Sequence, residues 1–422
     1  MPRPVIVAHN TRSGLAALNV VTAALQTDRE TSGVEVRFAR DRSELARELR
    51  SADAAGGMPV AAWSFYSPDF LASQEDLAWV RARAPGVHVA GGVHATAEPL
   101  AALRAGFDLI AVDEGESTAI ALAAALIAGR DPRALPGLSF LRQGGLVSNG
   151  PGERRPLDDF PPFNARAGKW NALEITRGCI YACSFCQTPF MFKARFRHRS
   201  VANVRAHVAR MRESGTVRYA RFLTPTCLSY GSLDHSVDPA AVEELLAAVR
   251  EELPEGKIYF GTFPSECRPE HVTPQALRLL KKYVDNRQLV IGGQSGSDRV
   301  LRAMHRGHSV EDVRRAVRAC VEAGFVPDVD FLLGLPGETA GDRALSISFA
   351  QELVDLGARI HSHAFMPLPG TPLSGALPEP IEEPARLALE RLESRGAMHG
   401  QWRAQRRIAQ DLVALRSSRD RG

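Results

Sequence analysis

The sequence contains 422 residues, of which 45% are hydrophobic and 24% are charged, and its formal net charge is +4. At about 150 residues per domain this length predicts two or three domains, and the average composition excludes a disordered, collagen-like or disulfide-rich chain. So small a net charge does not indicate a nucleic-acid partner. The longest alanine-rich apolar stretch, residues 119–128, is too short to span a bilayer, and the first residues do not resemble a secretory signal, so we expect a cytoplasmic protein without a membrane span.

The first 130 residues alternate β-rich runs with helical patterns. This alternation predicts a parallel sheet covered by helices, and five strands suit a flavodoxin-like (Rossmann-like) α/β domain. The strands are expected at residues 4–8, 34–38, 59–65, 87–91 and 109–112. Ligands of such sheets bind beyond the carboxyl ends of the strands, which here carry residues 64–67, 91–94 and 113–116.

Residues 131–168 are rich in proline, glycine and charged residues, and we expect them to form a linker. The segments LSFLR and GLVSN, on either side of a Gly-Gly pair, offer an alternative interpretation as a small β-hairpin. The predicted domains are a first domain at 1–130, the linker at 131–168, a barrel at 169–375 and a helical C-terminal tail at 376–422.

The second half of the chain shows six apolar strands at regular spacing. Each is separated from the next by 31 to 45 residues with a helical pattern between them, which is typical of a partial (β/α)6 TIM barrel. The chemistry of such barrels lies at the carboxyl ends of the strands. The strands are expected to begin near Ala172, Val217, Lys257, Gln288, Pro327 and Ile360.

The cysteines are unevenly placed. None of the six lies in the first 178 residues, and three of them, Cys179, Cys183 and Cys186, directly follow the first barrel strand. A structural zinc site requires four ligands, and no second pair of cysteines or histidines follows at zinc-finger spacing. Three thiolates on one loop instead suit an iron–sulfur cluster that keeps one iron open.

The pattern C-x-x-x-C-x-x-C, with Phe185 before the last cysteine, resembles the radical S-adenosylmethionine (SAM) superfamily. The resemblance implies that Cys179, Cys183 and Cys186 hold a [4Fe–4S] cluster and that SAM binds its open iron. It further implies that one electron, from an external reductant such as flavodoxin or ferredoxin, cleaves SAM to a 5′-deoxyadenosyl radical, chemistry that belongs to the cofactors.

Further segments match the superfamily in order along the chain. They are residues 291–297 after the fourth strand, 331–338 after the fifth and 366–372 after the sixth. After the second strand, Thr224 and Thr226 stand where many members have a Gly-Gly-Glu-type segment. The resemblance thus assigns to SAM the residues Phe185, Thr224, Thr226, Gln294, Ser295, Gly334, Leu335 and Glu338.

The first domain joined to this barrel resembles the cobalamin-binding subclass, which includes methyltransferases that act on unactivated carbon. The resemblance implies that a first SAM methylates the cobalamin, that a second yields the radical, and that the substrate radical takes the methyl group. A histidine ligand to cobalt is not implied, because the spacing around His9 does not fit D-x-H-x-x-G, and we expect His9 to face solvent. The positions implied to line cobalamin are Ser64, Gly91, Gly92, His94, Gly115 and Glu116.

Three other functions compete with a cobalamin-dependent methyltransferase. A radical cyclase, mutase or oxidase would use the same barrel without methyl transfer, and a noncatalytic iron–sulfur or corrinoid-binding sensor would use only the cofactors. The related methylthiotransferases carry three more cysteines in their N-terminal domain and end in a small β-barrel, which predicts that this chain is not one of them.

Some residues carry a second interpretation besides packing. Cys227, Tyr230 and Cys267 follow barrel strands and are candidate catalytic hydrogen donors, although packing is the commoner role of a buried cysteine. His361 and His363 alternate beside Asp328 and Asp330, which predicts a polar set inside the barrel. This set either binds a small-molecule or peptide substrate or consists of hydrogen-bonded residues at the barrel end. Either an anion site or a solvated strand is expected at Lys193, Arg195, Arg197 and Arg199.

Overall fold

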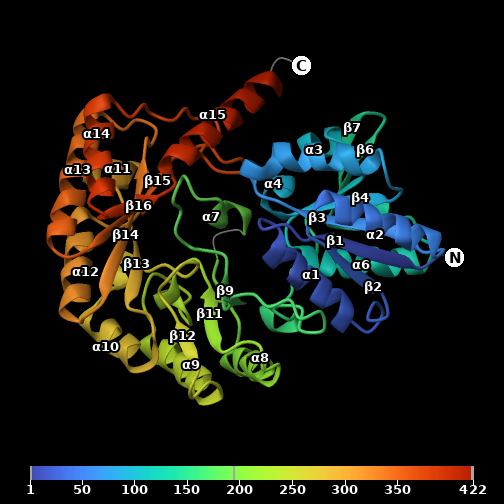
Figure 1. The fold of residues 1–422 in the computed structure, drawn as a ribbon, viewed down its shortest axis with the longest axis horizontal. Coiled ribbons are helices and arrows are strands. Elements are labelled where there is room, and N and C mark those ends of the chain that lie inside the picture. The colour runs from blue at the N-terminus through green and yellow to red at the C-terminus, as the bar shows by residue number, and fades with distance from the viewer. Residues whose placement is uncertain (1, 193–194, 420–422) are drawn as a thin grey trace. The chain divides into compact units, whose positions relative to one another are not determined.

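The computed structural model describes residues 2–192 and 195–419 and shows two compact units, Met1–Asn171 and Ala172–Gly422 (Figure 1). Each unit contains parallel strands with helices packed against them. The α/β class predicted from the alternation of strand and helix patterns is therefore confirmed.

The first unit is built on one seven-stranded sheet in the order β2-β1-β3-β4-β5-β6-β7. Its first five strands are parallel, and the order 2-1-3-4-5 is that of flavodoxin-like folds, with a switch in winding direction between β1 and β3. The strands are β1 (Pro4–His9), β2 (Glu35–Ala39), β3 (Met58–Ser64), β4 (Val87–Gly91), β5 (Leu109–Ala111), β6 (Leu138–Arg142) and β7 (Gly145–Ser148).

Helices cover this sheet, and apolar side chains from both layers form one core. α1 packs against α6 and α2 against α3, while Ile6 and Val60 of the sheet meet Leu25 and Leu122 of the helices. The helices are α1 (Leu15–Thr27), α2 (Arg42–Ala54), α3 (Phe70–Arg81), α4 (Gly92–Ala97), α5 (Pro99–Arg104) and α6 (Gly115–Ile127).

Residues 131–168, expected as a linker, contribute two strands to this sheet. β6 pairs antiparallel with β5, and β7 returns after a two-residue turn in which Gln143 and Gly144 both have positive φ. Leu138 and Phe140 enter the core of the unit. Asn164 donates hydrogen bonds to the α1 side chains of Thr22 and Gln26, so this segment is held by the first unit.

The second unit contains the six predicted barrel strands. Two parallel sheets, β12-β11-β8 and β13-β14-β15-β16, are linked by a bridge between Cys267 and Ile291, so the barrel is partial. A short antiparallel pair, β9 (Thr176–Arg177) with β10 (Arg197–His198), flanks the cysteine loop. The barrel strands are β8 (Leu173–Glu174), β11 (Tyr219–Leu223), β12 (Lys257–Tyr259), β13 (Gln288–Gln294), β14 (Val326–Leu333) and β15 (Arg359–Ala364).

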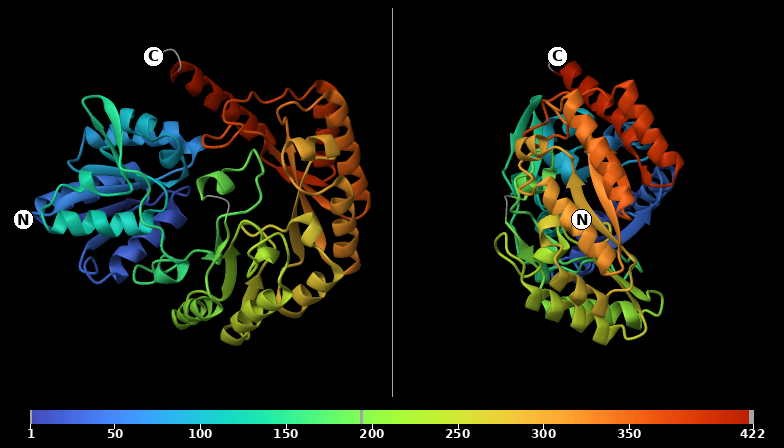
Figure 2. Two further views of the ribbon diagram at one scale, coloured as in Figure 1. Left: turned by 180° about the vertical axis from the view of Figure 1, so that it is seen from behind. Right: turned by 90° about the vertical axis from the view of Figure 1, so that its left-hand side faces the viewer.

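Helices follow these strands on the outside of the partial barrel (Figure 2). Most begin at a side chain that caps the first turn. For example, the hydroxyls of Ser309 and Thr339 each accept a hydrogen bond from the backbone N–H of the aspartate three residues later, and the side chain of that aspartate accepts one from the backbone N–H of the capping residue. These helices are α8 (Val201–Glu213), α9 (Pro239–Glu252), α10 (Pro274–Tyr283), α11 (Asp298–Ala303), α12 (Val310–Glu322) and α13 (Ala340–Asp355). The short helix α7 (Gln187–Met191) instead directly follows the last cysteine of the cysteine loop.

The C-terminal tail is helical, as predicted, but it also extends the barrel sheet. Between α14 (Glu383–Ser394) and α15 (Trp402–Arg419), strand β16 (Met398–Gly400) pairs in parallel with β15. The indole of Trp402 is buried and donates to Glu393 Oε1 at 2.9 Å, which ties the two helices together. Across the described residues, we find no helix with the length and hydropathy needed to cross a bilayer.

His9 lies in the core of the first unit rather than in solvent. It is only 4% exposed, and its ring centroid is 4.3 Å from that of Trp63, whose indole nitrogen donates to His88 Nδ1 at 3.1 Å. Burial lowers the pKa of both His9 and His88 to about 4, because the charged form would lose its hydration. The expectation of a solvent-facing His9 was therefore wrong.

These histidines make the stability of the fold depend on pH. Between about pH 6.5 and pH 4 the unfolded chain takes up protons that the folded chain refuses, so each buried histidine removes up to about 3 kcal/mol of unfolding free energy as the pH falls. Urea unfolding of the full chain, followed by tryptophan fluorescence, should show this slope reduced in His9→Gln and unchanged in the exposed control His305→Gln. Equal slopes in wild type and His9→Gln would contradict the assignment.

Candidate functional site

The loop that carries the three cysteines leaves β9 at Gly178. This glycine has a φ of +82°, and a β-carbon there would lie 2.0 Å from the carbonyl oxygen of Arg195. Only glycine tolerates both the left-handed backbone and the close approach. Residues 195–198 therefore run directly against the start of the loop and set its direction.

The three cysteines of the loop lie together and are unbridged. Cys179 and Cys183 are buried in one cluster with Tyr181 and Phe196, and Cys186 packs against it. Burial raises the pKa of Cys179 to about 12, and proximity to the other two thiols adds to the shift. Three converging thiols that repel each other as thiolates suit a cationic metal cluster, which on binding would displace their protons.

A turn between α11 and α12 fastens this loop from the barrel side. The backbone N–H of Ser184 donates to the carbonyl oxygen of Met304 at 3.1 Å. Two residues later, Arg306 Nη1 lies 3.3 Å from the sulfur of Cys183.

Phe185 and Leu335, both predicted to bind SAM, meet in one apolar cluster. Leu335 is fully buried with Met304 and Phe365, and Phe185 packs against the same group. The cysteine loop and the segment after β14, 150 residues apart in the chain, are thus brought to one place. An apolar wall of this kind excludes water and offers a face for an aromatic ligand.

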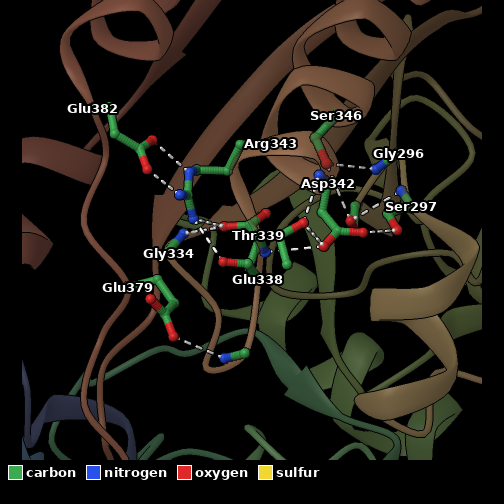
Figure 3. Close-up of polar contacts among 12 residues, drawn as sticks. Gly296, Ser297, Gly334, Glu338, Thr339, Asp342, Arg343, Ser346, Glu379 and Glu382 are labelled. Carbon is green, nitrogen blue, oxygen red and sulfur yellow. Dashed lines mark hydrogen bonds and ion pairs between the residues drawn. The ribbon is translucent and has the colours of Figure 1, made fainter.

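The segment after β13 that is predicted to bind SAM is held to α13 by hydroxyl groups (Figure 3). The Ser295 and Ser346 hydroxyl oxygens lie 3.1 Å apart, and Ser297 donates to Asp342 at 2.6 Å. Gln294, at the end of β13, has a φ of +72° although it is not glycine. The strand end is therefore sharply turned, and Ser295 serves to anchor it.

Glu338 closes a tight turn after β14 (Figure 3). Its Oε2 accepts the N–H of Gly334 at 3.1 Å and lies 3.8 Å from Arg343, which also pairs with Glu382. Burial raises the pKa of Glu338 to about 7. A β-carbon at Gly334, whose φ is +72°, would lie 2.9 Å from the Glu379 carbonyl oxygen, so this turn also requires glycine.

The two threonines after β11 differ in what their hydroxyls do. Thr224 Oγ1 donates to the carbonyl oxygen of Thr226 at 3.1 Å. Thr226 Oγ1 is buried and has no hydrogen-bond partner in the structure. An unmet buried hydroxyl is costly, which marks Thr226 as a position that a polar ligand group would complete.

Cys227 and Cys267 lie on the helix side of the strands. Their sulfur atoms are 3.2 Å apart, and Cys267 pairs with Ile291, whose neighbour on the next strand is Val329. Val329 lies between Asp328 and Asp330, which face the inside of the barrel, so Val329 faces the helices. The two thiols lie on the same side as Val329, toward Cys320 of α12. The structure does not bring them to the cysteine loop.

Tyr230 and the basic residues after the cysteine loop are largely structural. The Tyr230 hydroxyl donates to the carbonyl oxygen of Arg199 at 2.6 Å. Arg199 is 1% exposed and donates to the backbone of Glu174, and Arg197 belongs to β10. Lys193 lies outside the described residues.

The predicted polar set inside the barrel is present, and it is larger than expected. Asp330 Oδ1 lies 2.8 Å from His361 Nδ1, which lies 3.2 Å from His363 Nε2. On β16, His399 pairs with Asp328 at 2.9 Å and stacks on His361 with ring centroids 4.6 Å apart. The hydrogen bond to Asp330 raises the pKa of His361.

Asp330, His361 and His363 place ligand-type atoms within 4.8 Å of one another, as a metal site would. Gln405 of α15 argues against that interpretation. Its Oε1 accepts the N–H of Ala364 at 2.8 Å, so its amide nitrogen faces His363 Nδ1 at 3.2 Å and donates to it. The proton of a neutral His363 is then on Nε2, the nitrogen that faces Asp330 and His361. Nε2 therefore has no free lone pair with which to bind a metal ion.

Sequence reasoning missed four residues that complete these sites. Glu266, whose pKa is raised by burial and by Asp330, lies in a loop without a motif. The sequence of the tail gave no sign of a further strand, and no chemistry was predicted for Arg306. The missed residues are Glu266, Arg306, His399 and Gln405.

In the first unit, the carboxyl ends of β3 and β4 form a tight glycine-lined edge. A β-carbon at Gly92, whose φ is +86°, would lie 2.6 Å from Ser64 Oγ, and one at Gly14 would lie 2.3 Å from the Ser64 carbonyl oxygen. Gly91 ends β4 beside them. The structure thus brings Ser64, Gly91 and Gly92 together, close to the switch point of the sheet.

The other predicted cobalamin positions are more deeply placed. His94 is 2% exposed, with Nδ1 3.0 Å from Ser67 Oγ and its ring stacked on Phe70. Gly115 and Glu116 begin α6, where Glu116 is 4% exposed. Further along the same helix, the hydroxyl of Thr118 is buried and has no hydrogen-bond partner.

Comparison with known proteins identifies the barrel. The family model of the radical SAM superfamily matches residues 173–350. Among curated relatives, the tRNA-2-methylthio-N(6)-dimethylallyladenosine synthase of Pelobacter propionicus is 29% identical over 257 residues, covering 56% of this chain and 52% of the relative. That of Ralstonia nicotianae is 30% identical over 250 residues, covering 57% and 51%. This chain spans about half the length of the curated relatives it matches.

Solved structures resemble both units. The radical SAM methyltransferase TsrM from Kitasatospora setae, with cobalamin and a [4Fe–4S] cluster bound, has a TM-score of 0.68 at 19% identity, covering 90% of this chain and 77% of that chain. The cobalamin-dependent radical enzyme OxsB, with aqua-cobalamin and SAM bound, has a TM-score of 0.68 at 15% identity, covering 94% and 56%. At these identities the likeness shows a shared fold, an α/β domain followed by a partial barrel.

Gly178 tests whether the loop geometry serves metal binding. In Gly178→Ala the new methyl group would meet the Arg195 carbonyl, so the loop must move and the three thiols separate. Anaerobic reconstitution should give about four irons per chain for the wild type and about one or fewer for the variant. Gly341→Ala, where the added carbon meets nothing closer than 3.7 Å, is the matched control. Full iron content in Gly178→Ala, with circular dichroism unchanged, would contradict this assignment.

Proposed function

Because the chain contains a radical SAM domain at residues 173–350, we propose that it is a cobalamin-dependent radical SAM methyltransferase acting on an unactivated carbon of a small molecule or peptide. One observation carries this proposal: two features occur in the same chain. Three free cysteines converge at the mouth of a partial barrel, and the first unit has the strand order of flavodoxin-like folds, with glycines along its candidate ligand edge.

Cys179, Cys183 and Cys186 would hold a [4Fe–4S] cluster. The donor set fits, because two buried thiols and one half-buried thiol converge without a fourth among the described residues. The bound cluster supplies one electron to SAM and thereby the radical that removes a substrate hydrogen. The protein contributes the geometry: Gly178 admits the backbone that sets the loop, and the Met304 carbonyl holds its tip.

The proposed SAM site lies along the ends of the second, fourth and fifth barrel strands. Phe185 and Leu335 keep water from the adenine, and the unmet hydroxyl of Thr226 is offered to a polar group of the ligand. Ser295 and Glu338 act mainly by holding their turns in place. The full set proposed for SAM is Phe185, Thr224, Thr226, Gln294, Ser295, Gly334, Leu335 and Glu338.

The first unit is proposed to bind cobalamin at its glycine-lined edge. One feature of the edge supports this: Gly92 lies against Ser64 without space for a side chain, so the backbone there presents no side chain to a ligand. His9, buried against Trp63, is not offered as a cobalt ligand. The proposed lining residues are Ser64, Gly91, Gly92, His94, Gly115 and Glu116.

The inside of the barrel is proposed to bind the substrate. Asp330 orients His361 by accepting from its Nδ1, which leaves Nε2 to accept or release a proton. His399 and Asp328 repeat the arrangement beside it. An external flavodoxin- or ferredoxin-type protein is the proposed electron source.

A second candidate function is methylthio transfer, because the curated relatives that match the barrel are named as tRNA methylthio synthases. Two features favour methyl transfer instead. The first unit contains no cysteine for a second cluster, and its fold resembles that of structures with cobalamin bound.

The products of SAM distinguish these functions. With reductant, cobalamin and a metabolite extract, the reconstituted protein should form 5′-deoxyadenosine and S-adenosylhomocysteine in equal amounts, as chromatography with mass spectrometry would show. In Cys183→Ala both should fall by about tenfold or more, because a cluster ligand is lost. The matched control is Cys320→Ala, a buried cysteine of α12, which should retain activity.

Each other outcome selects a different function. 5′-Deoxyadenosine without S-adenosylhomocysteine indicates a radical reaction without methyl transfer. A sulfur-bearing product from tRNA indicates the second candidate, and no turnover with cofactors bound indicates a sensor.

Cobalamin binding is tested at Gly92. A valine there would be strained by the positive φ and would press on Ser64, so we expect the affinity for hydroxocobalamin to fall about tenfold. The corrinoid absorbance that remains with the protein after desalting measures this. Gly33→Ala, where the added carbon meets nothing within 4 Å, is the control. Equal retention by Gly92→Val and wild type would place the ligand elsewhere.

A further inference from the structure

Arg306 is a buried cation at the cysteine loop. Its side chain extends from the turn between α11 and α12, and the residue is only 8% exposed. Nη1 donates to the sulfur of Cys183 at 3.3 Å, and Nη2 donates to the carbonyl oxygen of Gly292 at 2.7 Å. The guanidinium carbon lies 5.9 Å from the ring centroid of Phe185.

Arg306 makes no direct ion pair with a carboxylate. Within the described ranges, no Asp or Glu oxygen comes within 4.0 Å of its guanidinium, and Nε is buried without a partner. The neighbouring Arg268, by contrast, pairs with Glu270 at 2.6 Å. Glu270 and Glu266 act on Arg306 only from beyond 4.0 Å, whereas Cys183 is in direct contact with it. A negative charge on the thiolates and on what they bind would therefore stabilise this buried guanidinium.

The guanidinium is also held rigidly. The carbonyl oxygen of Arg306 accepts a hydrogen bond from Arg268, whose own guanidinium stacks 3.5 Å from the ring of Tyr181 in the cysteine loop. His305 and Gly307, on either side, both have positive φ, which is typical of a tight turn. Arg306 is thus placed at Cys183 by contacts that do not depend on a ligand.

We propose that Arg306 is a positioning residue that raises the reduction potential of the [4Fe–4S] cluster held by Cys179, Cys183 and Cys186, a role that rests on the proposed function. In the reduction step one electron from the external reductant enters the cluster, whose total charge becomes more negative by one. A buried cation and a hydrogen bond to a ligand sulfur stabilise that reduced form more than the oxidised form. Removing the cation should therefore make the cluster harder to reduce.

A redox titration without SAM or cobalamin tests this role. The reconstituted full chain, R306Q, R306K and the exposed control R302Q would be titrated and followed by electron paramagnetic resonance. In R306Q the equilibrium constant for reduction should fall at least tenfold, a shift of about 59 mV or more to lower potential. R306K, which keeps the charge, should shift less than R306Q, and R302Q should match the wild type.

The outcomes separate this role from others. An unchanged potential in R306Q overturns the proposal, also when SAM binding is weakened, because that pattern would make Arg306 a ligand of SAM itself. If R306Q takes up little iron, R306K becomes the deciding variant. The proposal is supported if R306K retains its iron and its equilibrium constant for reduction changes less than tenfold. If R306K also loses iron while its circular dichroism is intact, Arg306 serves to fold the loop and the proposal is overturned. A wild type that assembles no cluster would refute the proposed function instead.

Discussion

The convergence of three thiols on one short loop is the constraint on which the rest of the barrel site depends. Thiols this close and this buried are unfavourable as free thiolates, and they require both a metal cluster and a rigid frame. The frame comes from three directions: the Arg195 carbonyl against Gly178, the Met304 carbonyl on the loop tip, and the Arg306 guanidinium at Cys183. Each of these groups lies elsewhere in the sequence, so the loop is held by tertiary contacts.

The inside of the barrel shows how the same strands serve two purposes. Residues of β14 that point outward, such as Val329 and Phe331, pack against the helices, while Asp328 and Asp330 point inward and pair with histidines. The polar groups are therefore satisfied without weakening the core. Gln405, from the last helix, sets the tautomer of His363 and so favours a hydrogen-bonded set over a metal site.

The first unit places its candidate ligand edge by sheet order. Because β1 lies between β2 and β3, the chain reverses its winding direction there, and the loops after β1 and β3 diverge. Gly14 and Gly92 pack against Ser64 at this point. Segment 131–168 completes the unit, since the apolar side chains of Leu138 and Phe140 on β6 extend the core, and β7 becomes the edge strand.

Local patterns in the sequence determined much of the fold: the six barrel strands, the five parallel strands of the first unit and the grouping of the cysteines all follow from periodicity and spacing, which are local properties. The sequence also placed Phe185 and Leu335 at one site, through their motifs. Only the tertiary structure decided that Cys227 and Cys267 face the helices, that His9 is buried, that the tail adds β16, and that Arg306 reaches Cys183. These features depend on which face of a strand is turned inward and on contacts between distant segments, and no local pattern encodes either.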